Sequence, residues 1–234
     1  MSTSRYLRYA IGEILLVVVG ILIALSIDNW NENRKERIQL EGYLRTIQKN
    51  IQADTVDIKF QNKLYQGKSV MARGVIRNLF FEKYDADTLF LALPAVAERY
   101  VRVDLSGFES LKNSGYISKL QGTKMADALF DYYNTYNRVL EQEISLNNYI
   151  ETMEAKLFDI PSETLIETLK LLSSDLFDTV IIQPKHPEKT ARELYHNSHI
   201  IGIMQRTADE NSNQYVRLLK KAEVLLALIE EEIN

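Results

Sequence analysis

The sequence predicts an all-α fold in which one N-terminal transmembrane helix continues into a long amphipathic helix, packed with a helical extramembrane domain. Three observations support this prediction. An apolar run from Tyr9 to Ile27 lies near the start of the 234-residue chain. Apolar residues at helical spacing then continue to about Phe81 without a proline. The later segments keep helical spacing too, and the whole chain has only four prolines to interrupt them.

The apolar run has the length of a membrane span. A hydrocarbon core of roughly 30 Å needs about 20 mostly apolar residues, whereas Ile14 to Ile27 would rise only about 20 Å. The span therefore includes Glu13. We expect a cytoplasmic tail at 1–8, a transmembrane helix at 9–30 and a helical, periplasmic domain at 31–234. Aromatic side chains suit the two membrane interfaces, and the expected interface anchors are Tyr6, Tyr9 and Trp30.

Basic residues on the two sides of the span bear on its orientation. Arg5 and Arg8 precede it, which favours a cytoplasmic N-terminus and a periplasmic domain on the inner membrane. A second group of cations beyond the span opposes this orientation, although acidic residues intersperse them: Arg34, Lys35 and Arg37. A cleaved signal peptide ending near Ala24-Leu25-Ser26 is the alternative to an anchor. Glu13 argues against it, because a signal peptide carries only positive charge before its apolar run.

One seam of the membrane helix predicts self-association. Its members alternate by four and three residues and are Glu13, Val17, Gly20, Ala24 and Ile27. Gly20 and Ala24 form a small-xxx-small pair, which lets two membrane helices approach closely. We expect membrane lipid and a homo-oligomer as partners. The Glu13 carboxylate costs a few kcal/mol in hydrocarbon and so faces a protein partner or water, unless it reaches the headgroups beside a nearby arginine.

A second apolar stripe follows the membrane segment. Its members keep helical spacing and are Leu40, Leu44, Ile47, Ile51 and Ile58. On a straight helix, at about 100° per residue, this stripe does not line up with the Glu13 seam. The sequence therefore predicts that the membrane seam meets other subunits, while the stripe packs on later helices of the same chain.

The remaining elements are read from caps and breaks. Asp85 caps a helix that Pro94 limits, and residues 100–105 form either a very short strand or an extended connector. Ser106 caps the next helix, which Gly115 ends in a left-handed conformation. Three longer helices are then expected: Lys124 to Phe158, one beginning at Ser162, and one from Pro187 to Glu232 with a bend near Asn211.

Few residues suggest chemistry. The chain lacks phosphate loops, nucleophile elbows and cofactor fingerprints, which predicts no enzyme and no cofactor. The absence of cysteine excludes disulfides and thiol nucleophiles, and a net charge of −4 argues against a nucleic-acid partner. Glu193, His196 and His199 step by three on a predicted helix, where either a metal site or an exposed polar face fits. The clustered tyrosines are expected in the core, with a ligand pocket as the alternative: Tyr132, Tyr133, Tyr136 and Tyr149.

Two segments resemble a known family. Arg8–Lys35 is similar to the start of a family of uncharacterised single-pass membrane proteins widespread in Bacteroidota, and Phe108–Gly115 (Phe-Glu-Ser-Leu-Lys-Asn-Ser-Gly) is similar to that family's second motif. The resemblance implies an inner-membrane anchor with a helical periplasmic domain, and it assigns no functional residue. Glu13 at the start of an apolar helix also resembles type IV pilin-like proteins. However, Arg8 stands where a leader peptidase needs a small residue.

The hypotheses for function follow from these features. The leading one is a non-enzymatic, inner-membrane-anchored helical scaffold or sensing module that self-associates through its transmembrane helix. The alternative is an ion-coupled accessory subunit that uses Glu13 beside a multi-span membrane protein. Two further hypotheses are a pilin-like assembly subunit and a metal- or ligand-binding sensor built on the region of His186, His196 and His199.

Overall fold

The computed structural model describes residues 3–156, 161–172, 185–209 and 213–233, and in these residues the fold is all-α without a strand. Along the chain the helices are α1 (Thr3–Phe80), α2 (Ala86–Ala92), α3 (Ser106–Asn113), α4 (Lys124–Glu154), α5 (Ser162–Leu172), α6 (Pro187–Tyr195), α7 (Ser198–Asp209) and α8 (Asn213–Ile233). Two short 3-10 helices, η1 (Leu93–Val96) and η2 (Tyr116–Leu120), follow α2 and α3. The predicted fold class is confirmed.

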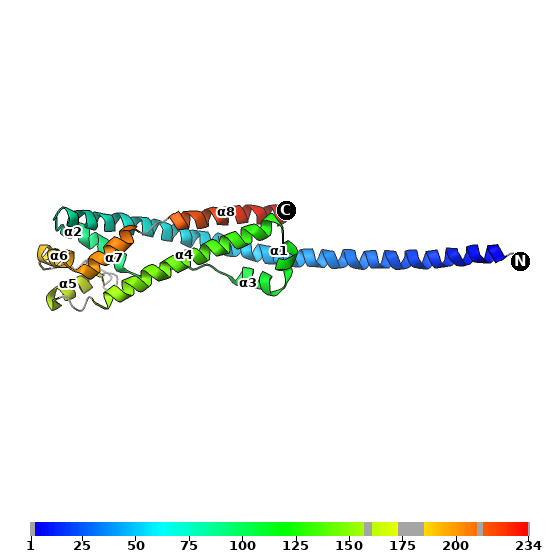
Figure 1. Ribbon diagram of the computed structural model, residues 1–234, viewed down its shortest axis with the longest axis horizontal. Coiled ribbons are helices and arrows are strands. Elements are labelled where there is room, and N and C mark those ends of the chain that lie inside the picture. Colours follow the sequence, from blue (N-terminus) through cyan, green and yellow to red (C-terminus); the bar gives the residue numbers. More distant parts are fainter. Residues whose placement is uncertain (1–2, 157–160, 173–184, 210–212, 234) are drawn as a thin grey trace.

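The N-terminal apolar run and the amphipathic stripe that follows it belong to one uninterrupted helix. α1 has 78 residues, which at 1.5 Å per residue is about 120 Å of helix. Its N-terminal part projects alone from the bundle (Figure 1), and its C-terminal part packs against α7, α8, α3 and α2. The C-terminal end of α8 lies near the point where α1 leaves the bundle (Figure 1). The bundle therefore has one end next to the projecting segment and one end far from it.

The stripe on α1 is the inner wall of the hydrophobic core, as the sequence predicts. Leu44, Ile47, Ile51 and Ile58 are fully buried, and burying such a side chain stabilises the fold by about 1.5–3 kcal/mol. The same hydrophobic core includes apolar residues of later helices: Leu129, Val139 and Ile150 of α4, Ile203 and Met204 of α7, and Leu218, Leu225 and Ile229 of α8. The core thus joins segments that are far apart in the sequence.

The caps predicted for the middle of the chain hold at two positions and fail at one. Asp85 accepts the Thr88 N–H at 2.7 Å, and Gly115 has φ 78°, so both predictions are confirmed. Ser106 does not cap α3, because it is already the first helical residue. The Asp104 carboxylate accepts the Ser106 N–H at 2.9 Å instead. An aspartate two residues earlier competes successfully for the first free backbone N–H groups of the helix.

The segment between η1 and α3, residues 97–105, is an extended connector rather than a strand. In the long helix that follows, the Thr123 hydroxyl caps the start by accepting the Ala126 N–H at 3.2 Å. α4 ends at Glu154, earlier than the predicted Phe158, and residues 157–160 lie outside the described part of the chain.

The single helix predicted from Pro187 to Glu232 is wrong, because the chain forms α6, α7 and α8 there. The break between α6 and α7 has a local cause. The Asn197 side-chain oxygen accepts the backbone N–H groups of His199 and Ile200, both at 3.0 Å. This is the geometry of an asparagine N-cap, so Asn197 starts a new helix within the apolar pattern. Residues 210–212, which include the predicted bend at Asn211, lie outside the described residues.

Candidate functional site

The projecting part of α1 is the most unusual feature of the molecule. From Gly12 onward, α1 contains an 18-residue window with a mean hydropathy of 2.0, and none of this window is buried. Among the described residues, α1 is the one helix long and apolar enough to cross a membrane. A water-soluble fold would leave a large unfavourable apolar surface here. The structure is therefore compatible with a single-pass membrane protein.

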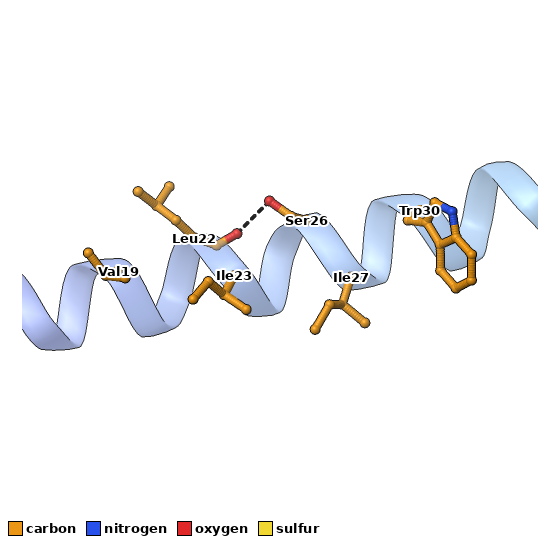
Figure 2. A pocket seen from close by; sticks show the side chains of 6 residues that line it. All are labelled: Val19, Leu22, Ile23, Ser26, Ile27 and Trp30. Carbon is orange, nitrogen blue, oxygen red and sulfur yellow. Dashed lines mark hydrogen bonds between the residues drawn. The ribbon is translucent and has the colours of Figure 1, made fainter.

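The side chains of this segment suit hydrocarbon. Val19, Leu22, Ile23 and Ile27 line a shallow hollow on one side of the helix, closed at one end by Trp30 (Figure 2). The one hydroxyl in the hollow, that of Ser26, donates to the Leu22 carbonyl at 2.7 Å. Because this bond lies within the helix, the hydroxyl needs no partner from water. Trp30 is 65% exposed, and the Arg34 guanidinium lies 5.7 Å from its ring centroid.

The residues predicted to act in the membrane all remain free of the chain's own bundle. Glu13, Gly20 and Ala24 are exposed. A Cβ atom built on Gly20 would meet nothing within 4 Å outside its own helix. Tyr6 and Tyr9, the predicted interface anchors, lie on the first turns of α1. The seam is thus available to another molecule.

Helix geometry separates the seam from the buried stripe. Ile47 follows Gly20 by 27 residues, and Ile51 follows Ala24 by the same number. At 3.6 residues per turn this is about seven and a half turns. Ile47 and Ile51 are both fully buried, so the helices of the chain cover the side of α1 that lies opposite Gly20 and Ala24. The predicted separation of the two faces is confirmed on the bundle side.

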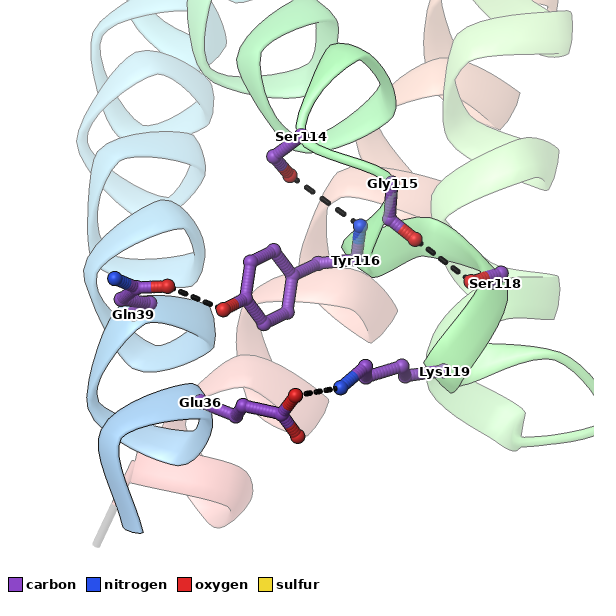
Figure 3. A network of polar contacts seen from close by, with 7 residues as sticks. All are labelled: Glu36, Gln39, Ser114, Gly115, Tyr116, Ser118 and Lys119. Atoms are coloured by element: carbon purple, nitrogen blue, oxygen red, sulfur yellow. Dashed lines mark hydrogen bonds and ion pairs between the residues drawn. The ribbon is translucent and has the colours of Figure 1, made fainter. Parts of the chain in front are cut away.

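Polar contacts join α1 to the α3–η2 segment just beyond the projecting part. The Tyr116 hydroxyl donates to the Gln39 side-chain oxygen, and the Lys119 ammonium pairs with the Glu36 carboxylate (Figure 3). Deeper in the bundle, a Cβ atom on Gly107 would lie 3.0 Å from the Ile47 backbone nitrogen. The absence of a side chain at Gly107 lets α3 approach the backbone of α1 this closely.

Buried acidic and amide side chains hold the connector, and the sequence analysis did not identify them. Val101 N–H donates to Glu143 Oε2 at 2.9 Å, and the Tyr215 hydroxyl donates to Glu143 Oε1 at 2.5 Å. The Asn147 side chain makes two hydrogen bonds to the backbone of Arg99: it donates to the Arg99 carbonyl at 2.8 Å and accepts the Arg99 N–H at 3.4 Å. An extended backbone without a neighbouring strand needs such partners. The hydrogen bonds from these side chains take the place of the backbone hydrogen bonds that a neighbouring strand would make.

Asp54 is a further buried acidic side chain, and burial disfavours its charged form. It is 6% exposed, and both of its oxygens accept the Asp104 N–H, at 3.1 and 3.2 Å. Burial raises the pKa of Asp54 to about 6. The hydrogen bond from the Asp104 backbone opposes this rise, while the negative charges of Asp104 and Asp57 add to it. A sequence signal existed, because Asp54 falls at a core position of the Ile47, Ile51, Ile58 stripe.

The tyrosines lie in the core, as predicted. Tyr132 and Tyr133 are buried, and Phe108 stacks on Tyr133 with ring centroids 4.0 Å apart. The hydroxyls of Tyr132 and Tyr133 have no hydrogen-bond partner among the described atoms. Burial raises the pKa of Tyr136, while its bond to the Val103 backbone opposes the rise. The Tyr149 hydroxyl would lie 2.7 Å from a Cβ on Gly202, so this glycine makes room for it.

The histidine region does not keep the predicted spacing on one helix. Glu193 belongs to α6, His196 is its C-cap and His199 belongs to α7. Glu193 accepts a hydrogen bond from the Thr164 hydroxyl, and the His196 ring packs 4.9 Å from the Tyr84 ring. In the described part of the chain, no group of three or more His, Cys, Asp or Glu residues could hold a metal ion.

The chain matches a protein-family model. The model of a family of unknown function, DUF6090, matches residues 13–181. This range covers α1 from Glu13 onward, the connector, α3 and α4. The chain belongs to the DUF6090 family. Searches of curated proteins and of solved structures found no match. The resemblance to an uncharacterised family is therefore confirmed, and DUF6090 membership assigns no activity to any residue of the site.

Proposed function

We propose that this DUF6090 protein is a non-enzymatic, inner-membrane-anchored helical scaffold or sensing module that self-associates through its transmembrane helix. The basic residues Arg5 and Arg8 favour a cytoplasmic N-terminus, which places the bundle in the periplasm. Lipid surrounds the anchor. The sequence lacks catalytic fingerprints, which supports a non-enzymatic role.

One observation carries the proposal. The Gly20 and Ala24 seam is exposed, and it lies about half a turn of helix away from the side of α1 that the chain's own helices cover. A second copy can reach this seam without displacing any part of the bundle. Small residues allow close packing of two membrane helices, and packing drives their association in lipid.

The test is the native mass of the full-length protein extracted gently from membranes. Gly20→Leu and Ala24→Leu are expected to reduce the oligomer to monomer, because each adds bulk at the point of closest approach. Val18→Leu is the matched control, since Val18 lies two residues from Gly20 and faces the other side of the helix. A wild-type monomer, or an oligomer that all three substitutions leave unchanged, contradicts the proposal.

The same preparation tests the ion-coupled alternative. A multi-span protein that co-purifies with the chain in fixed ratio would favour an accessory subunit over a scaffold. Glu13→Gln then separates the two functions, because removal of the charge abolishes ion coupling but leaves packing at Gly20 and Ala24 in place.

A further inference from the structure

On the outward side of α1 beyond the membrane, the bundle leaves large apolar side chains uncovered, interspersed with the exposed polar residues Arg45, Lys49, Gln52 and Lys63. Four large residues there have high exposed fractions: Ile38 60%, Val56 68%, Phe60 56% and Val70 61%. Exposed apolar groups scattered singly need no explanation, but a row along one helix marks an interaction surface. We call this row, together with Gly42 and Gly67, the outward face of α1.

The outward face continues the membrane seam. Ile38 and Val56 follow Gly20 by 18 and 36 residues, which is about five and ten full turns. Gly42 and Phe60 follow Ala24 by the same two intervals. The angular positions of Gly20 and Ala24 around the helix are thus each occupied twice more along the same side of α1.

No neighbouring element that the structure describes lies close to the glycines of the outward face. A Cβ atom on Gly42 or Gly67 would meet nothing within 4 Å outside the helix, whereas one on Gly107 or Gly202 would collide with a neighbouring element. A glycine inside a helix costs about 0.5–1 kcal/mol relative to alanine. Close approach of another helix at Gly42 and Gly67 would offset this cost.

We propose that the outward face of α1 packs against the same face of a second copy, so that the contact of the membrane helices continues into the extramembrane bundle. This inference rests on the proposed self-association. Two copies anchored in one membrane are parallel, and a continuous α1 presents the outward faces to each other at the same height. From Val56 to Val70 the spacing alternates by four and three residues, as in a parallel coiled-coil seam.

Exposed cations modulate this contact; Arg45 is one of them and pairs with Glu41 of its own helix at 2.7 Å. Lys49 and Lys63 are exposed on the outward face, and in a parallel pair each lies near its own symmetry mate. Their ammonium groups remain in water while the stems cover apolar surface. Repulsion between them is screened by salt, so the extramembrane contact is stronger at high ionic strength than at low.

Single-cysteine variants of the full-length chain test the inference, because the natural sequence has no cysteine. Val56→Cys and Phe60→Cys are oxidised mildly in native membranes and compared with Asp57→Cys and Lys59→Cys. The latter two positions are also exposed but point away from the centre line of the outward face through Val56, Asp57 by roughly 100° and Lys59 by roughly 60° to the other side. A disulfide-linked dimer at positions 56 and 60 that is lost at 57 and 59 is expected.

The other outcomes overturn the inference in distinguishable ways. Equal dimer bands at all four positions indicate random collision. Absence of dimer at 56 and 60 in a chain whose native mass is oligomeric overturns the inference and leaves the membrane association intact. A monomeric native mass removes the proposed function and the inference together.

Discussion

The Asp54 carboxylate on α1 accepts the backbone N–H of Asp104 through both of its oxygens, at 3.1 and 3.2 Å. Asp104 in turn accepts the Ser106 N–H at 2.9 Å, at the first residue of α3. Asn50, one turn before Asp54, donates to the Ser106 hydroxyl at 3.2 Å. Asn50 and Asp54 on α1 therefore fix where the connector ends and where α3 begins.

Asp54→Asn is expected to change how stability depends on pH. The folded-state pKa of Asp54 is about 6, against 3.8 for the free group, so the folded protein binds more protons between these values. The contribution of Asp54 to stability is then complete below about pH 4 and is lost as pH rises through about 6. Relative to the variant, wild type should gain up to about 3 kcal/mol between pH 7.5 and pH 4.

Thermal unfolding of the full-length protein in detergent at several pH values measures this difference. Asp87→Asn is the control, since Asp87 is exposed on α2, and its stability should parallel wild type across the range. A constant difference in unfolding midpoint between Asp54→Asn and wild type from pH 7.5 to pH 4 would refute the prediction.

Glu143→Leu is expected to destabilise the bundle on the order of 3 kcal/mol, because the Val101 N–H and the Tyr215 hydroxyl would lose a buried acceptor. Tyr215→Phe removes one donor only and should cost about 1 kcal/mol. Chemical denaturation of the single variants and the double variant measures the coupling between the two residues. If the two effects simply add, the bond between Glu143 and Tyr215 does not contribute as described.

Gly107→Ala should destabilise the fold by about 1–3 kcal/mol, because the added methyl group would lie 3.0 Å from the Ile47 backbone nitrogen. Gly42→Ala is the comparison on α1: in the dissociated chain, where no second copy packs at Gly42, alanine should stabilise the fold by about 0.5–1 kcal/mol. Opposite signs of the two changes in denaturant midpoint are expected. A stabilising Gly107→Ala would show that α3 does not approach α1 so closely.

Phe60→Glu should weaken self-association and leave the fold of each chain intact, since Phe60 is 56% exposed and a carboxylate there would face its own symmetry mate. Lys59→Glu changes an adjacent exposed residue that turns away from the outward face and serves as the control. Native mass at increasing dilution reports association, and the unfolding midpoint reports the fold. A dissociation profile shared by wild type and Phe60→Glu would argue that the outward face is uncovered in the oligomer.

Several elements were predictable because local signals fix them. The Asp85 cap, the left-handed Gly115 and the buried stripe at Ile47 and Ile51 all follow from residue type and spacing. The helix break at Asn197 was missed because an apolar pattern continues through it, while one asparagine side chain captures two backbone N–H groups. Asp54 and Glu143 were missed because their partners lie 50 and 42 residues away along the chain.

The sequence alone determined the all-α class, the long first helix with its apolar run, and the family to which the chain belongs. Periodicity and composition are sufficient for these features, since they depend on neighbours within a few turns. Only the tertiary structure decided which side of α1 the later helices cover and which buried carboxylates hold the connector. Those outcomes depend on packing and desolvation between distant segments, and they leave the Gly20 seam and the outward face of α1 as the surfaces open to another molecule.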